Sequence, residues 1–171
     1  MEFHTEREEA LYTTLKQVLQ NHVATHRLSY QHTLAACIPV LGYILYVMIE
    51  TWEEAPGLIA STIDELHQRV HTRALHALPT LPAFQDYAPP PDVSTQYQEL
   101  GTALATLLTT SGIEYDLSVV ATWRTYLALV ADILVMPLQA YEQRPEELEA
   151  YIESLRDDLF GLMHMWDEER S

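Results

Sequence analysis

Residues 28–36 read LSYQHTLAA and residues 113–121 read IEYDLSVVA, and the second stretch falls on the first at a constant offset of 85 positions. The same offset extends the match backwards without a gap. The aligned pairs keep their apolar, aromatic or small character: Tyr12 with Tyr97, Leu15 with Leu100, Leu19 with Leu104, Leu28 with Ile113, Tyr30 with Tyr115, and Ala36 with Ala121. One half alone would leave an apolar face exposed, which a second copy can cover. We therefore expect two tandem repeats that form a pseudo-twofold bundle.

The chain is predicted to be all-helical. Its 171 residues contain only 5 glycines, hairpin dipeptides are missing, and apolar residues recur at three- and four-residue spacing. Each repeat is expected to hold three helices. The predicted helices cover residues 5–25, 30–52 with a bend at Pro39, 56–78, 95–109, 116–141 and 145–167.

A proline-rich segment separates the two halves. Residues 79–94 contain five prolines, which disfavour helix and favour an extended connector. The predicted organisation is a single domain with one repeat over residues 1–78, a linker over 79–94 and a second repeat over 95–171.

Composition narrows the function classes. With 48% hydrophobic residues the chain can bury a core without metal or disulfides, and its one cysteine, Cys37, cannot form an internal bridge. No signal-peptide pattern is seen, so a cytoplasmic location is expected. The formal charge of -16 repels phosphate backbones, which argues against nucleic acid as a partner.

The longest uncharged stretch, residues 28–49, raises the question of a membrane span. It contains a proline, a glycine and several polar side chains, and its counterpart in the second half carries Arg124 and Asp132. A buried core helix explains this stretch better, and no membrane association is expected.

The two halves differ at one informative position. Where the first half has Gln31, the second has Asp116, and each follows a tyrosine and enters a long apolar helix. One interpretation of Asp116 is a helix N-cap, which is worth about 1 kcal/mol. The other is a general base at the mouth of a pocket between the halves, where loss of water would raise the pKa of its carboxyl group.

The segment around Asp116 resembles a known family. Residues 112–123, GIEYDLSVVATW, are similar to the segment around the catalytic aspartate of the group I 2-haloacid dehalogenases, the DehI family, with glycine, aspartate, alanine and tryptophan at matching spacing. The likeness continues through Met136-Pro137-Leu138, and in the first half through Gly42-Tyr43-Ile44 and Asp64-Glu65-Leu66. That family is all-helical, with its active site between two repeats.

The resemblance implies hydrolytic dehalogenation of short 2-haloalkanoic acids without a cofactor or a metal. Asp116 would activate the water that displaces halide. Residues expected near the substrate by position, rather than by matched identity, are Tyr30, His32, Tyr115, Thr122 and Trp123.

Other chemically reactive side chains are interpreted as structural. His22 and His26, and also His67 and His71, have the i, i+4 spacing that lets two imidazoles bind one metal, but the glutamates of a bundle di-iron site are not found. We expect no metal site. Cys37 lies in an apolar run and is expected to be a buried, inert thiol.

Two function classes remain open from the sequence. One is a dehalogenase-like hydrolase in which Asp116 is the base. The other is a noncatalytic helical module that binds a small apolar ligand or a partner protein in the cleft between the repeats. A homodimer is a further possibility, because a shortened repeat would leave apolar surface to cover.

Overall fold

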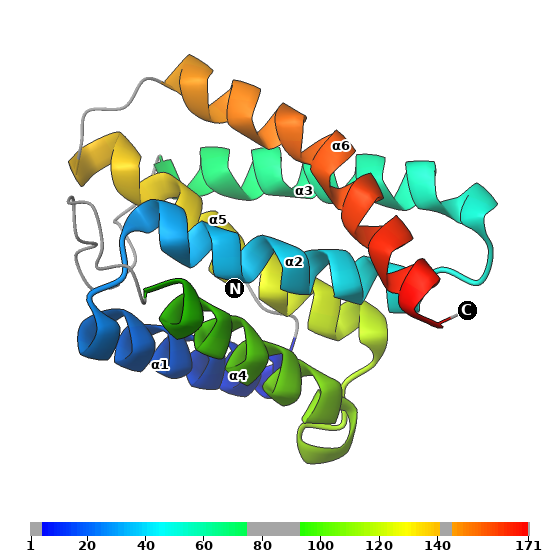
Figure 1. Cartoon of the computed structure of the whole chain (residues 1–171), viewed down its shortest axis with the longest axis horizontal. Coiled ribbons are helices and arrows are strands. Elements are labelled where there is room, and N and C mark those ends of the chain that lie inside the picture. The colour runs from blue at the N-terminus through cyan, green and yellow to red at the C-terminus, as the bar shows by residue number, and fades with distance from the viewer. Residues whose placement is uncertain (1–4, 75–92, 141–144, 171) are drawn as a thin grey trace.

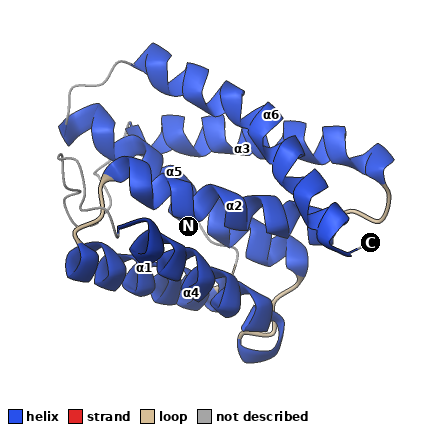
Figure 2. Ribbon diagram, in the orientation of Figure 1, coloured by secondary structure: helices blue, strands red, loops and turns tan. Residues whose placement is uncertain are grey.

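The computed structural model describes residues 5–74, 93–140 and 145–170, and this part of the chain is all-helical, as expected (Figure 1). Figure 2 shows helices joined by short loops there, and no strand. The described elements are α1 (Glu6–His26), α2 (Tyr30–Met48), the short 3-10 helix η1 (Trp52–Glu54), α3 (Ala55–Ala74), α4 (Val93–Glu114), α5 (Val119–Ala140) and α6 (Pro145–Arg170).

Polar side chains fix where several helices begin. Thr5 caps α1 through a capping box with Glu8, and the Ser29 side chain accepts a hydrogen bond from the His32 backbone at the start of α2. At the start of α5, the Oγ atom of Ser118 accepts a hydrogen bond of 3.1 Å from the backbone N–H of Ala121. Each cap satisfies a backbone donor that the first helical turn leaves unpaired.

Helices from the two ends of the chain interleave in the bundle. Figure 1 shows α2 between α4 and α6, and α2 contacts both of them. In the same way α5 contacts α1 and α3, while α1 packs on α4, α3 on α6 and α2 on α5. Most helix pairs therefore join an element before residue 75 to one after residue 92, so the two segments share one core.

Apolar faces at helical spacing build that core. Leu11, Leu15 and Leu19 of α1 are fully buried, and so are the α5 residues from Tyr126 to Ala131. In α3, Ile59, Ile63, Leu66 and Val70 are buried as well, and Leu58 packs against the core while partly exposed. Removing this apolar area from water supplies the main driving force for folding.

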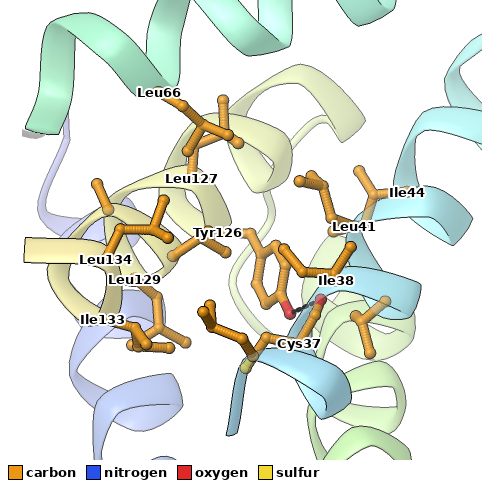
Figure 3. Close-up of a cluster of buried hydrophobic side chains, with 14 of the residues drawn as sticks. Cys37, Ile38, Leu41, Ile44, Leu66, Tyr126, Leu127, Leu129, Ile133 and Leu134 are labelled. Atoms are coloured by element: carbon orange, nitrogen blue, oxygen red, sulfur yellow. Dashed lines mark hydrogen bonds between the residues drawn. The ribbon is translucent and has the colours of Figure 1, made fainter. Parts of the chain in front are cut away.

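Cys37 and Tyr126 meet at the centre of the core (Figure 3). The Tyr126 hydroxyl donates a hydrogen bond of 2.7 Å to the Cys37 carbonyl oxygen, which satisfies a polar group that has no access to water. Burial raises the pKa of the Cys37 thiol to about 12. The prediction that this thiol is buried is therefore confirmed, and its inertness stays a prediction.

Two glycines allow α2 to approach its neighbours closely. A β-carbon on Gly101 of α4 would come 3.2 Å from the Ala36 carbonyl oxygen, and one on Gly42 of α2 would come 2.8 Å from the β-carbon of Leu162 in α6. Both crossings depend on the missing side chain. They set the spacing of α4 and α6 on either side of α2.

A buried ion pair joins α1 to α5. Nη2 of Arg124 donates a hydrogen bond of 2.9 Å to Oε1 of Glu8, whose side chain is 2% exposed. The Tyr12 hydroxyl also donates to the buried Asp132 carboxylate. These contacts place charged and polar groups in an otherwise apolar helix interface, where each needs its partner.

The predicted helix ends that fall on described residues agree with the structure within about five residues, and both ends next to Asp116 differ from the prediction. Helix α4 continues to Glu114 rather than stopping near residue 109, and α5 begins at Val119 rather than at residue 116. The predicted linker over residues 79–94 lies almost wholly outside the described residues. One helix, over Gln31–Met48, is long and apolar enough to cross a membrane, but 56% of that stretch is buried in the bundle, as the core-helix interpretation expects.

Candidate binding groove over helix α2

Asp116 lies in the turn between α4 and α5. Its backbone is left-handed, with φ at 53°, a conformation that aspartate tolerates better than most residues. Its side chain is 82% exposed, and its Oδ2 atom accepts a hydrogen bond of 2.8 Å from Nη1 of Arg7. The general-base interpretation requires a partly dry pocket around this carboxylate. The structure places the carboxylate in water instead.

The N-cap interpretation of Asp116 is not met either. The helix begins at Val119, and the side chain that accepts from its first turn belongs to Ser118. The sequence placed the helix start too early because Asp116 and Ser118 are both good capping residues. Asp116 instead occupies the left-handed position of the turn that ends α4.

The other residues expected around a substrate do not converge on Asp116. His32 is held by Ser29 at the start of α2, and Figure 1 shows that end of α2 and the α4–α5 turn on different sides of the bundle. The Tyr115 hydroxyl lies 2.8 Å from the Thr14 hydroxyl oxygen of α1. The side chain of Tyr30 lies outside the described residues.

Thr122 and Trp123 are adjacent in sequence but face different neighbours. The indole N–H of Trp123 donates a hydrogen bond of 3.2 Å to Oγ1 of Thr62 in α3. Thr122 is buried, bonds to the Ser118 carbonyl oxygen, and lines a pocket beside α2. The four of these residues whose side chains are described therefore bond to different parts of the bundle.

The main concave feature of the described residues is a groove along α2, which we call the α2 groove. It consists of three adjoining cavities of about 800, 1100 and 230 Å³, which share lining residues where they meet. We call them the first cavity, the central cavity and the end pocket. Together they follow α2 from Gln31 to Val47, about 25 Å at the helical rise of 1.5 Å per residue.

The floor of the α2 groove is apolar. It is formed by one face of α2, where small residues leave room above the backbone. Its members are Leu34, Ala35, Ile38, Pro39, Val40 and Tyr43. Pro39 lies inside the continuous helix α2. The small side chains of Ala35 and Ala36 also line the central cavity, which lies between Gly101 of α4 and Met165 of α6.

The α4 wall is rich in threonine. The side chains of Thr106, Thr109 and Thr110 each donate a hydrogen bond to a backbone carbonyl of their own helix, at 2.8, 2.7 and 3.3 Å. A hydroxyl that is satisfied in this way leaves the methyl group as the part free to contact a ligand. The wall is therefore more apolar than its composition suggests.

The α6 wall is acidic at its rim. Asp158, Gly161, Met165 and Glu169 follow one another at three- and four-residue spacing, so they share a face of α6. Among the described residues, neither Asp157, Asp158 nor Glu169 makes an ion pair, and no lysine or arginine lines any of the three cavities. The groove thus combines an apolar floor with carboxylates that have no cationic partner.

One residue of the α6 wall, Gly161, has free space where a side chain would lie. A β-carbon on Gly161 would meet nothing within 4 Å. A side chain placed there would project into the first cavity without a backbone clash. This position allows the groove to be filled by mutation.

The histidine pairs do not build a metal site in the described residues, where no three histidine, cysteine, aspartate or glutamate side chains converge on a common point. His67 lies 2.9 Å from Oε1 of Glu153, and this contact, with a second one from Arg156, lowers the pKa of the Glu153 carboxyl group. The rings of His22 and His26 are 5.9 Å apart, and His26 lies 3.7 Å from Glu99.

Sequence reasoning did not find the α2 groove. Which face of an apolar helix stays uncovered depends on how its neighbours cross it, and that is not visible in a hydropathy pattern. Two features of the sequence could have pointed to the groove. They are the threonines within residues 102–110 and the glycine at 161, which line its walls.

No family model, no curated protein and no solved structure matches the chain. The resemblance to the dehalogenases therefore rests on the residues quoted in the sequence analysis.

Proposed function

We propose that this chain is a noncatalytic binding module that holds a cationic, amphipathic helix of a partner protein in the α2 groove. The observation that carries the proposal is the combination of an apolar floor on α2 with unpaired carboxylates on the α6 rim. An amphipathic helix would place its apolar face on the floor and its lysines or arginines beside Asp157, Asp158 and Glu169.

The dimensions of the groove favour a helix over a small molecule. Small-ligand pockets enclose most of their ligand, whereas the α2 groove runs about 25 Å along the surface of α2. A helix of about 16 residues has this length, and its width of about 10 to 12 Å suits a trough between two flanking helices.

The charge of the chain supports a basic occupant. The formal charge is -16, and within the described part of the chain no cationic side chain lines the groove. A basic segment would be steered toward this surface, and an anionic ligand would be repelled from it. For the same reason we do not expect a nucleic acid or an anionic membrane surface there.

A comparison of the two halves gives a reason why the groove is open on α2. We infer that the halves are related repeats, because α2 lies between α4 and α6 as α5 lies between α3 and α1. At the offset of 85, Ile38 and Pro39 correspond to Trp123 and Arg124. Trp123 bonds to α3, and Arg124 pairs with Glu8 of α1. Large side chains therefore occupy the face of α5 that corresponds to the groove-lining face of α2.

Hydrolysis of 2-haloalkanoic acids stays a prediction from the resemblance, and the geometry gives it less support. Such a reaction needs a base shielded from bulk water and a cation for the substrate carboxylate. Asp116 is exposed, and its nearest cation, Arg7, is already paired with it and is itself exposed. The binding module is therefore the function that we favour.

The test uses a fluorescein-labelled peptide of about 18 residues, made of leucine and lysine with the leucines on one helical face, and measures fluorescence anisotropy. We expect saturable binding. Gly161→Leu, which adds a branched side chain to the wall of the first cavity, is expected to weaken binding about tenfold or more. Gly57→Leu is the matched control, since a β-carbon on Gly57 also meets nothing within 4 Å and Gly57 does not line the groove.

A second pair of variants tests the charges. Asp157→Asn with Asp158→Asn is expected to weaken binding and to reduce its salt dependence. Glu146→Gln with Glu147→Gln removes the same charge from the same helix, away from the α2 groove, and should have a smaller effect. Equal losses in both double variants, or equal binding by the Gly161 and Gly57 variants, would contradict the proposal.

A further inference from the structure

The end pocket differs from the rest of the α2 groove. It is the smallest of the three cavities, about 230 Å³, and it lies where α2, α4 and the start of α5 meet. It shares Val40, Tyr43, Ala105 and Thr109 with the central cavity, so the two are continuous. A chain lying in the groove therefore passes the opening of this pocket.

None of the described residues that line the end pocket is charged. Its walls are formed mainly by Ile44, Leu108, Leu117 and Val119, and the hydroxyls of Thr109 and Thr122 are bonded to backbone carbonyls of their own chain. An apolar cavity of about 150 Å³ is large enough to bind benzene. The end pocket thus has the volume and the chemistry for one large apolar side chain.

Exposed apolar residues surround the end pocket. Val119 in its wall is 49% exposed, and Ile113, next to Gly112 in the wall, is 90% exposed. Exposed apolar side chains gathered at one place are typical of interaction surfaces. The partner would cover them when it fills the pocket.

Building on the proposed function, we infer that the end pocket receives a single large apolar side chain of the partner helix, a tryptophan, phenylalanine or leucine near one of its ends. This anchor sets the register of the helix in the groove. The carboxylates Asp157 and Asp158 lie at the first cavity, so the basic residues of the partner lie about three helical turns from the anchor. The partner is recognised by an apolar anchor at one end and basic charge toward the other.

The experiment starts from the leucine and lysine peptide used above. In two separate peptides, a leucine near one end or near the other is replaced by tryptophan, and each peptide is paired with an alanine version. We expect one of the two tryptophan peptides to bind about tenfold more tightly than its alanine counterpart. The other tryptophan peptide carries its anchor at the end away from the end pocket. It should bind with nearly the same affinity as its alanine counterpart.

Gly112→Leu tests whether the gain comes from the end pocket. A β-carbon on Gly112 makes only an ordinary contact, 3.5 Å from the Leu117 carbonyl oxygen, and Gly112 lines no other part of the groove. This variant should abolish the gain from tryptophan, whereas Gly57→Leu should keep it. In the unmutated chain, methyl NMR signals of Leu117 and Val119 should shift with the tryptophan peptide more than with the alanine peptide.

The outcomes separate this inference from the proposed function. If the parent peptide binds and responds to Gly161→Leu but tryptophan brings no gain, the anchor inference alone is wrong. The same holds if the gain survives Gly112→Leu and the two methyl signals stay unshifted. If the parent peptide does not bind the unmutated chain, both proposals are overturned.

Discussion

Gly42 and Leu162 mark a close approach of α2 and α6, since a β-carbon added to Gly42 would lie 2.8 Å from that of Leu162. One residue before Leu162, Gly161 faces open space, with nothing within 4 Å of an added β-carbon. Both glycines lie inside long helices, but they have opposite roles. The first lets the helices pack, and the second leaves the α2 groove open.

The two glycines are expected to respond in opposite ways to alanine. Gly42→Ala should lower the free energy of unfolding by about 1 to 3 kcal/mol, because the added methyl group overpacks the crossing. Gly161→Ala should raise it by about 0.5 to 1 kcal/mol, because alanine favours helix and meets no neighbour. Urea unfolding of the two variants checks this. If both variants are destabilised by the same amount, close packing against Leu162 is not the reason why alanine is unfavourable at Gly42.

Two arginine–carboxylate pairs join α1 to the second half of the chain at nearly the same distance but with different burial. Arg124 pairs at 2.9 Å with Glu8, whose side chain is 2% exposed, whereas Arg7 pairs at 2.8 Å with Asp116, whose side chain is 82% exposed. Arg124→Met should cost about 2 to 3 kcal/mol, because it leaves a buried carboxylate without its cation. The arginine itself is 33% exposed, which keeps the loss below that of a fully buried pair.

Arg7→Met is the matched control and should cost less than about 1 kcal/mol, as exposed pairs do. Thermal unfolding at low and high salt distinguishes the two pairs, since only the exposed pair is strongly screened. Similar losses in both variants, with similar salt dependence, would mean that burial of Glu8 is not what makes its pair important.

Burial of Cys37 predicts a loss of stability in alkali. The folded chain holds the thiol proton up to a pKa of about 12, whereas the unfolded chain releases it above about pH 9. Unfolding therefore releases a proton between these pH values, so stability falls as the pH rises, by up to about 1.4 kcal/mol per pH unit. Burial also raises the pKa of Tyr126, which acts in the same direction.

Unfolding free energies at pH 7, 9 and 11, for the unmutated chain and for Cys37→Ala, measure this effect. The alanine variant should be less stable at pH 7, because a core atom is lost, but it should lose less stability on going to pH 11. An identical pH slope in the two proteins would show that the thiol does not titrate as described. A native thiol that reacts rapidly with iodoacetamide at pH 8 would contradict its burial.

The left-handed backbone at Asp116 predicts a simple order of stability. Asp116→Gly should be close to neutral, because glycine adopts this conformation freely, and Asp116→Ala should cost about 1 kcal/mol. Unfolding midpoints of the two variants measure the difference. If alanine is tolerated as well as glycine, the turn does not hold the residue in the left-handed region.

Catalysis by Asp116 is tested separately, by halide release from 2-chloropropionate. The exposed, paired carboxylate leads us to expect no release above the rate in buffer. Release that disappears in Asp116→Asn, with an unchanged melting temperature, would restore the dehalogenase prediction. Asparagine suits this test because it also tolerates a left-handed backbone.

Much of the fold could be predicted from the sequence. The apolar spacing located every described long helix, and these helices bury apolar faces, around Leu15 in α1 and around Ile63 in α3 for example. Helix ends were less certain where several polar residues compete to cap a helix, as Asp116 and Ser118 do before α5. Local preferences on their own do not show which of the two residues takes that position.

The candidate site could not be predicted in the same way. Asp116 stood out because Gln31 lies 85 positions before it, but a difference between the two halves of the sequence does not show whether a side chain faces a cavity or water. The α2 groove depends on how closely α4 and α6 approach α2, which is set by contacts at Gly101 and Gly42 between segments distant in sequence. Those contacts appear only once the helices are packed.

The most direct test of the α2 groove is NMR mapping of the chain during titration with the leucine and lysine peptide. We predict that the largest changes in amide and methyl signals lie on the groove-facing residues of α2, α4 and α6, among them Ala35, Thr106 and Gly161. Signals from residues that line none of the three cavities, such as those of Gly57 in α3, should stay unchanged. Changes spread evenly over the acidic surface, or centred on α1 and α3, would contradict the proposed binding site.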